Sequence, residues 1–209
     1  MCKMVCISNN CLGGNLYKHV FKSEYTSPFI WSRITNPEFI FLLDNFKTID
    51  FSSIHSEFYA NEECYNLIVD DKIKILYPHY HVSNDDTIRV NGEDVYYKNI
   101  NAYTIEKYKA RLEKMRNELA QNTPLLLCYQ DAFNVERYGI MNEQTIYKIL
   151  EHSHEFAKTI ILTRYDMFRS FNNDNVYVDI LPEHIPPMKY IDANKPKLLD
   201  FLGLSKSQK

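Results

Sequence analysis

The 209-residue chain lacks a long apolar run, an excess of one charge, and the glycine and proline content of a repetitive or disordered protein. Its 24 basic and 27 acidic residues give a formal net charge of -3, which argues against nucleic acid as a partner. No apolar stretch approaches the ~20 residues that cross a bilayer, so we expect no transmembrane segment, although peripheral membrane contact stays open. With 5 glycines and 8 prolines, collagen-like repeats and long disordered tracts are excluded.

The cysteines form neither a disulfide framework nor a metal site. They number five, and Cys2, Cys6 and Cys11 crowd into the first strand and the loop after it. Their gaps fit neither paired zinc ligands nor an iron-sulfur run, so we predict no metal. The first ten residues also lack the apolar region of a signal peptide. Reduced thiols and no leader favour a cytoplasmic protein.

Apolar periodicity predicts alternating strands and helices. Residues 4–8 form a short β-favouring segment, and buried-type strands at 125–129 and 159–163 enclose a helix at 143–156. Strand, helix and strand in that order predict a parallel pair, because the crossover helix covers the sheet. We therefore expect a single α/β domain over residues 1–209, a three-layer α/β/α sandwich with a mixed, largely parallel sheet.

Turn and cap signals place the remaining elements. Asn36 before Pro37 predicts the start of a helix, and Asn101 is a plausible cap for a second helix. The expected elements are helices at 15–21, 36–46, 101–119 and 195–202, and hairpins at 67–76 and at 87–97 around Asn91-Gly92.

Cys11 is the strongest candidate for chemistry. It lies between a strand and a helix, where the helix dipole and unpaired N–H groups lower a thiol's pKa and make it nucleophilic. Asn9, Asn10 and the amides of Gly13 and Gly14 would then surround an oxyanion. The alternative is that Cys11 is a small packing residue in a tight turn.

Asp131 and Arg164 follow the two predicted parallel strands, at the edge where α/β sheets bind ligands. Asp131 could act as a base or orient a hydroxyl, Arg164 could hold an anion, and both could be ordinary loop charges. No histidine is placed to assist Cys11, since His19 lies about two turns, or ~12 Å, along the same helix. His79 and His81 are predicted to lie in a surface loop.

The N-terminal string ISNNCLGGNLYKHV, followed by EYTSPFI, resembles the start of a bacterial family described as domain of unknown function 1919. Matching positions are Ser8, Asn9, Asn10, Cys11, Gly13, Gly14, Tyr17, Tyr25, Ser27 and Pro28. Further on, Tyr108 and Arg111 look like part of its basic helix, while Asp131 and Thr163 fall on strands similar to its later ones.

The resemblance implies a role in exopolysaccharide or capsule biosynthesis. Our leading hypothesis is a transferase that moves an acyl group, with acetyl-CoA as the donor, to a small-molecule or lipid-linked glycan. Its catalytic residues would be Cys11 and Asp131. The expected substrate-binding residues are Ser8, Asn9, Asn10, Gly13, Gly14, Tyr17, Arg111 and Arg164. Two alternatives stay open: a transferase that uses a sugar phosphate or nucleotide sugar, in which the loop binds phosphate, and a non-catalytic glycan-binding or scaffolding protein rich in aromatic residues.

Overall fold

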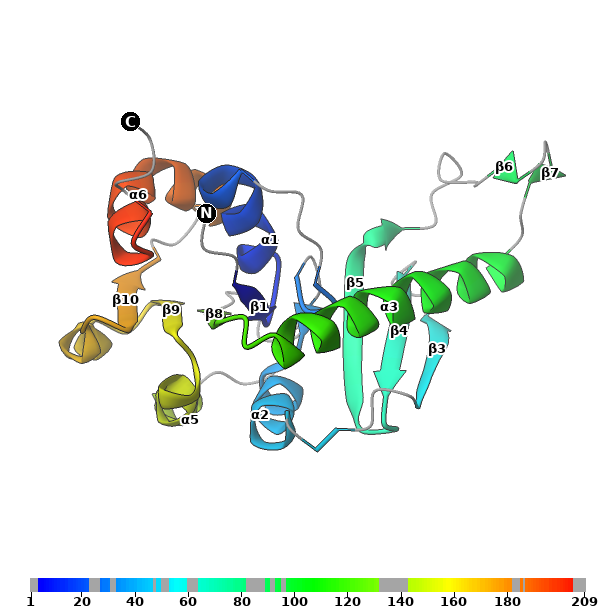
Figure 1. The fold of residues 1–209 in the computed structure, drawn as a ribbon, viewed down its shortest axis with the longest axis horizontal. Coiled ribbons are helices and arrows are strands. Elements are labelled where there is room, and N and C mark those ends of the chain that lie inside the picture. Colours follow the sequence, from blue (N-terminus) through cyan, green and yellow to red (C-terminus); the bar gives the residue numbers. More distant parts are fainter. Residues whose placement is uncertain are drawn as a thin grey trace.

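A computed structural model gives the fold of the chain (Figure 1). It describes residues 4–22, 27–30, 33–46, 48–49, 53–59, 64–81, 89–90, 93–94, 97–131, 143–181, 185 and 187–204. Cys2, Tyr25 and the predicted Asn91-Gly92 turn lie outside these residues.

A parallel sheet of four strands in the order β1-β8-β9-β10 forms the centre of the larger part of the fold. Its strands are β1 (Val5–Ser8), β8 (Leu125–Gln130), β9 (Lys158–Thr163) and β10 (Val176–Ile180). Every neighbouring pair is parallel, so the predicted parallel pairing of the strands at 125–129 and 159–163 is confirmed. β10, which the sequence analysis missed, extends the sheet at its outer edge.

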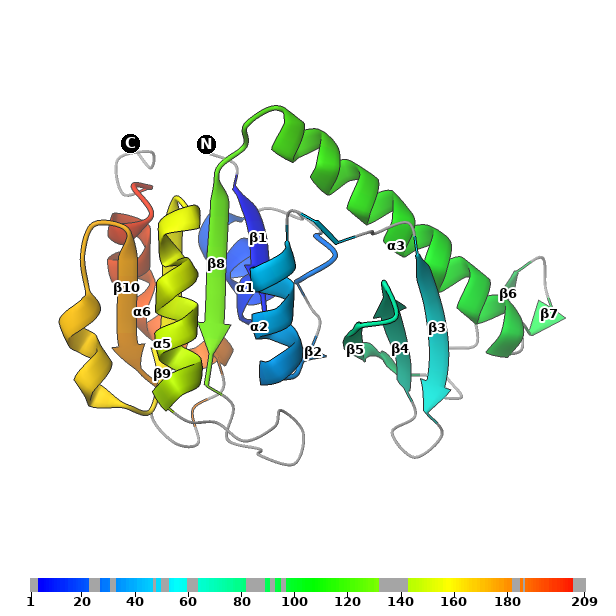
Figure 2. The same cartoon turned by 90° about the horizontal axis from the view of Figure 1, so that it is seen from below.

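Helices cover both faces of this sheet (Figure 2). One apolar cluster joins the sheet to α2 and α5, and a second joins its other face to α1, η1 and α6. The expected three-layer α/β sandwich is therefore confirmed. The bounds are α1 (Leu12–Leu16), η1 (Tyr17–Phe21), α2 (Asn36–Asn45), α5 (Glu143–His152), η3 (Ser153–Glu155), η4 (Asp166–Phe171) and α6 (Pro187–Phe201).

The antiparallel strands form a sheet of their own, in the order β2-β5-β4-β3, beside the sandwich. Its strands are β2 (Arg33–Ile34), β3 (Ile54–Tyr59), β4 (Cys64–Val69) and β5 (Ile73–His81). The long helix α3 (Tyr97–Ala120) runs from the sandwich to this second sheet, as Figure 2 shows. Whether both sheets belong to one domain over residues 1–209 stays a prediction.

Turn chemistry explains the hairpin between β4 and β5. Asp70 and Asp71 both adopt positive φ, at 54° and 52°, as tight two-residue hairpin turns require. β6 (Arg89–Val90) and β7 (Glu93–Asp94) pair antiparallel, which confirms the second hairpin in a shorter form. His79 and His81, predicted in a surface loop, instead lie on β5, because the strand continues through Pro78.

Several helix ends differ from the prediction. Thr35, not Asn36, caps α2, because the Thr35 hydroxyl donates to Glu38 at 2.6 Å and the Glu38 carboxylate accepts the Thr35 N–H in a capping box. α3 begins at Tyr97, so Asn101 lies inside the helix. α6 begins at Pro187, eight residues before the predicted start at 195, and so covers the sheet more fully.

Candidate functional site

Buried polar side chains gather where the strands of the parallel sheet end. These ends lie side by side because β1, β8 and β9 are parallel and in register. Parallel sheets place ligands at this carboxyl edge, since the loops that follow the strands converge there. The buried polar residues at this edge are Ser8, Asn9, Asn10, Gln130, Asp131 and Thr163.

Asp131 occupies the centre of this edge, directly after β8. Its side chain is 2% exposed, and its Oδ2 accepts hydrogen bonds from the backbone N–H and Nε of Arg164, both at 3.1 Å. The Thr163 hydroxyl lies 3.3 Å from the same oxygen. Arg164 and Asp131 are thus brought together, as the sequence analysis predicted for the ends of neighbouring strands.

The second carboxylate oxygen of Asp131 is different, because Oδ1 is buried and has no hydrogen-bond partner among the described residues. Buried polar atoms without partners are rare and costly, so an unsatisfied one in a cluster of polar groups indicates a place for a ligand or water. Burial also raises the pKa of Asp131 above its usual value, although the hydrogen bonds and charge of Arg164 lower it. A carboxylate in this state is a better base than an exposed one.

The sequence analysis missed two further polar residues with unsatisfied buried atoms, Asn36 and Gln130. The Tyr129 hydroxyl donates to Oδ1 of Asn36 at 3.1 Å, and Nδ2 of Asn36 is buried without a partner among the described residues. Oε1 of Gln130 is also buried without one. Asn36 lies on α2, far from β8 in sequence. The sequence analysis interpreted it as a helix cap, because it stands directly before Pro37.

Asn9 has a structural role that its expected place in a substrate loop did not predict. Its side chain is fully buried, its Nδ2 donates to the carbonyl of Gln130, and its Oδ1 accepts the N–H of Gln130, both at 3.0 Å. The amide thus takes the place of a neighbouring strand's backbone and extends the β1–β8 pairing by one residue. Asn9 therefore joins the two strands whose ends form the site.

The loop from Ser8 to the first turn of α1 satisfies its own N–H groups. The Ser8 hydroxyl accepts from the N–H of Gly13 at 3.2 Å, and Oδ1 of Asn10 accepts from Leu12 at 2.9 Å. The prediction that the Gly13 amide would face an oxyanion is therefore wrong, because a side chain of the same loop already occupies it. Gly13 and Gly14 both lie in α1 and are buried.

Gly13 is required by close packing rather than by a ligand. A Cβ at this position would lie 2.8 Å from Sγ of Cys6 and 3.0 Å from both Ile30 and Ser8. The absence of a side chain lets α1 approach β1 closely.

Cys11 is partly buried at the start of α1. Burial raises the pKa of its thiol to about 11, although a hydrogen bond to its own backbone lowers it. This direction is opposite to the predicted one, because burial removes the water that would stabilise the thiolate. The thiolate that a cysteine nucleophile needs is therefore scarce near neutral pH.

Tyr17 and Arg111 lie on two other elements, η1 and α3. The hydroxyl of Tyr17 donates to the carbonyl of Met4, and its buried ring stacks on Phe21 at 4.8 Å between centroids. Arg111 lies on α3, one turn after Tyr108, whose hydroxyl donates to the carbonyl of Pro28 at 2.9 Å. Neither position has been tested as a substrate contact, and both stay predictions.

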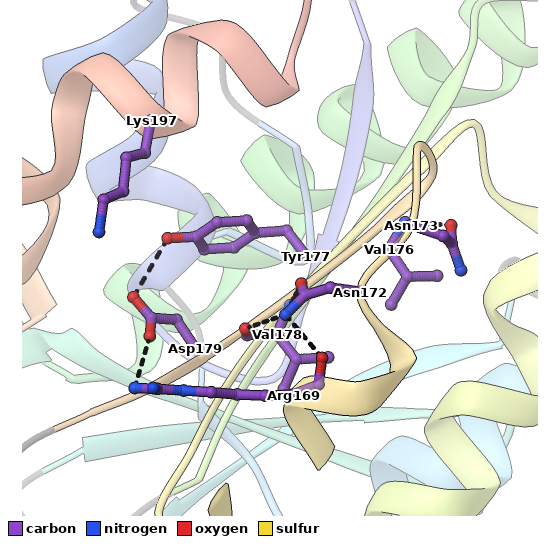
Figure 3. A pocket seen from close by; sticks show the side chains of 8 residues that line it. All are labelled: Arg169, Asn172, Asn173, Val176, Tyr177, Val178, Asp179 and Lys197. Carbon is purple, nitrogen blue, oxygen red and sulfur yellow. Dashed lines mark hydrogen bonds and ion pairs between the residues drawn. The ribbon is translucent and has the colours of Figure 1, made fainter.

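A surface cavity of about 490 Å³ lies at the outer edge of the sheet, beside β10 (Figure 3). Its lining residues come from η4, β10, the loop between them and α6, and none of them was predicted as a site residue. The alternation of apolar and polar residues in VYVDI could have indicated the strand and hence this edge.

The fold and these contacts define an α/β sandwich protein with a buried polar site at the carboxyl edge of its parallel sheet. Residues 2–99 match the family described as domain of unknown function (DUF1919), and this match supports the chain's membership of that family. The matched part includes the loop with Cys11 but neither Asp131 nor Arg164, so the likeness of the later strands stays a prediction.

No curated protein and no solved structure matches the chain. Within the part of the chain that the structure describes, no helix combines the length and the apolar character that a bilayer span needs.

Proposed function

We propose that the protein is an enzyme of bacterial surface polysaccharide biosynthesis that transfers an acyl group to a sugar hydroxyl. The observation that carries the proposal is the asymmetric environment of Asp131. One carboxylate oxygen is held by Arg164 and Thr163, while the other is buried without a partner among the described residues. A sugar hydroxyl that donates to Oδ1 would satisfy this oxygen and be oriented by it.

In the proposed reaction, Asp131 acts as the general base. Oδ1 takes the proton of the sugar hydroxyl as its oxygen attacks the carbonyl carbon of an acyl thioester such as acetyl-CoA. A C–O bond forms, the C–S bond breaks, and the departing thiolate takes up the proton that Asp131 received, which restores the carboxylate. Arg164 and Thr163 keep the carboxylate fixed in one orientation, which general-base catalysis requires.

For Cys11 we propose a contact in the donor site in place of a nucleophilic role. Its raised pKa disfavours attack by a thiolate, and the transfer above needs no covalent acyl-enzyme. Ser8, Asn10 and Gly13 shape the loop around Cys11 through their mutual hydrogen bonds. Their contribution to substrate binding is therefore the position of the loop, not donated N–H groups.

The biological context of the proposal rests on the family resemblance, because members of that family are typically encoded among polysaccharide biosynthesis genes. A cytoplasmic location belongs to the same proposal. It is supported by the free thiols of Cys6 and Cys128, whose sulfur atoms lie 3.6 Å apart on neighbouring strands. Such thiols suit a reducing compartment.

The test is an acyl-transfer assay with the Asp131→Asn variant, in which release of CoA from acetyl-CoA is followed with bacterial polysaccharide fragments as acceptors. Loss of a general base lowers turnover by roughly 10² to 10⁴-fold. Asp174→Asn is the matched control, because Asp174 is exposed and lies away from this edge. Because burial raises the pKa of Asp131, the native rate should fall with decreasing pH at a higher pH than the usual aspartate value of ~3.9.

Equal turnover by the Asp131→Asn and Asp174→Asn variants would contradict the catalytic role of Asp131. Binding of the acceptor without any transfer, by native protein supplied with each acyl donor, would instead support the non-catalytic glycan-binding alternative. Thermal unfolding of both variants separates a loss of catalysis from a loss of structure.

A further inference from the structure

The outer cavity beside β10 is built from the continuous stretch that holds η4 and β10, and from one residue of α6. The lining residues are Arg169, Asn172, Asn173, Val176, Tyr177, Val178, Asp179 and Lys197. Figure 3 shows the Lys197 ammonium, the Tyr177 hydroxyl, the Asp179 carboxylate and the Arg169 guanidinium following one another along one side.

Asp179 is already saturated with hydrogen-bond donors. Its Oδ1 accepts from Nη2 of Arg169 at 3.2 Å and from the N–H of Ile180 at 2.8 Å, while its Oδ2 accepts from the hydroxyls of Tyr177 and Tyr190. Burial alone would raise the pKa of Asp179, but the hydrogen bonds from Tyr190 and these other groups lower it. The carboxylate therefore stays ionised and orients its neighbours, and it has no acceptor position left for a ligand.

The two asparagines in the lining are also engaged. Oδ1 of Asn172 accepts the N–H of Val178 at 2.6 Å and its Nδ2 donates to the carbonyl of Val178 at 2.9 Å, so its amide pairs with the free edge of β10. Oδ1 of Asn173 accepts the N–H groups of Asn175 and Val176. The carboxylate and amide oxygens of Asp179, Asn172 and Asn173 are thus used within the protein.

What the cavity still offers is positive charge and N–H donors. Lys197 is exposed and makes no hydrogen bond or ion pair with a described residue. Arg169 pairs with Asp166 through Nε and with Asp179 through Nη2. Because a guanidinium has five N–H donors, the others can still bind a ligand. With Asp179 as the one acidic lining residue against Arg169 and Lys197, the lining carries a net charge of +1.

We propose that this cavity binds a phosphorylated sugar, with the phosphate monoester held between Lys197 and Arg169 and the sugar against the ring of Tyr177. A planar arginine fork and a lysine point charge together suit a phosphate, which carries acceptors but few donors. The volume of about 490 Å³ exceeds what an inorganic anion needs and leaves room for the sugar.

The position of the cavity connects it to the proposed active site, and this step rests on the proposed function. Asp179 on β10 pairs with Leu162 on β9. Leu162 in turn pairs with Gln130 on β8, the residue before Asp131. At ~4.8 Å per strand, the backbones of Asp179 and Gln130 are ~10 Å apart. A sugar phosphate or a short phosphorylated glycan could therefore be anchored at β10 while its hydroxyl approaches the carboxyl edge.

The test is isothermal titration of the protein with glucose 1-phosphate in the absence of any acyl donor. Lys197→Gln removes the unpartnered charge and should weaken binding at least tenfold, which corresponds to about 1.4 kcal/mol. Lys189→Gln is the matched control, since Lys189 is exposed on the same helix and does not line the cavity. The thermal midpoint of Lys197→Gln should equal that of the control, because no described contact is lost.

Glucose, glucuronate and inorganic phosphate identify the part of the ligand that is recognised. Weaker binding of all three than of glucose 1-phosphate supports the proposal. Glucuronate that binds as tightly as glucose 1-phosphate would overturn the choice of phosphate, and equal affinity for inorganic phosphate would overturn the sugar contact. No binding of glucose 1-phosphate to native protein, or equal affinities of the two lysine variants, would overturn the site itself.

The Asp131→Asn variant separates this inference from the proposed function. Its loss of acyl transfer tests the proposed function, whereas weaker binding of glucose 1-phosphate by Lys197→Gln than by Lys189→Gln tests the outer cavity alone. Equal binding by the two lysine variants together with loss of transfer in Asp131→Asn would overturn the inference and leave the proposed function standing.

Discussion

Replacement of Asn9 by alanine tests whether this residue binds substrate or holds the site together. In the structure, its amide satisfies both the N–H and the carbonyl of Gln130 in a fully buried position. Asn9→Ala leaves both groups without a partner, at about 1–3 kcal/mol for each. We therefore expect the free energy of unfolding to fall by roughly 2–6 kcal/mol, a large part of the ~5–15 kcal/mol that a domain has.

The measurement is equilibrium unfolding in urea. With a slope of ~2 kcal/mol per molar urea, a loss of 3 kcal/mol lowers the midpoint by about 1.5 M. Asn15→Ala is the control, because Asn15 lies on α1 and its side chain makes no hydrogen bond with a described residue, so the change should stay within about 0.5 kcal/mol. If the two variants unfold at the same urea concentration, the strand-joining role of Asn9 is refuted.

Asn9→Asp adds a test of direction with pH. An ionised carboxylate accepts the N–H of Gln130 but repels its carbonyl oxygen, whereas the protonated acid donates to that oxygen. The native state thus favours the protonated form, which raises the folded pKa of the new carboxyl above the unfolded one. Stability relative to Asn9→Ala should therefore increase as pH falls through that raised pKa. A decrease over the same range would contradict this geometry.

Two further predictions concern the neighbouring loop. Since burial raises the pKa of Cys11 to about 11, alkylation of its peptide by iodoacetamide should accelerate about tenfold per pH unit up to that range; a rate that levels off below pH 8.5 in mass-spectrometric mapping would show an activated thiol instead. Gly13→Ala should lower stability by about 1–3 kcal/mol in urea, because the new Cβ meets Sγ of Cys6 at 2.8 Å. Cys6→Ala in the same chain should recover part of this loss, and a purely additive pair would exclude that contact.

The predictable parts of the fold are those with a strong local signal. The apolar strands predicted at 125–129 and 159–163, with an amphipathic helix between them, indicated a parallel pair. The structure confirms that pair. Their ends placed Asp131 beside Arg164, because equivalent ends of parallel strands meet at one edge. The antiparallel strands were partly recognised, but their pairing into a second sheet joins β2 to strands that follow it only after α2, which no local pattern encodes.

The candidate site was less predictable than the fold. Cys11 has the right position in the chain for an activated thiol, yet its pKa depends on how much water the packed loop excludes. Asn9 has the residue type of a ligand-binding loop, and only the approach of β8 shows that its amide is used for backbone pairing. The outer cavity escaped notice because Arg169, Asp179 and Lys197 come from three elements with no shared spacing.

The sequence by itself determined the class of fold, the parallel pairing of the strands at 125–129 and 159–163, and the placement of a carboxylate and a guanidinium at one edge. These follow from short-range patterns of apolar residues and from the geometry of crossover connections. Tertiary structure alone decided which polar groups have partners among the described residues and which have none, as at Oδ1 of Asp131 and at Lys197. The physical reason is that hydration and hydrogen bonding depend on neighbours in space, and these neighbours come from distant parts of the chain.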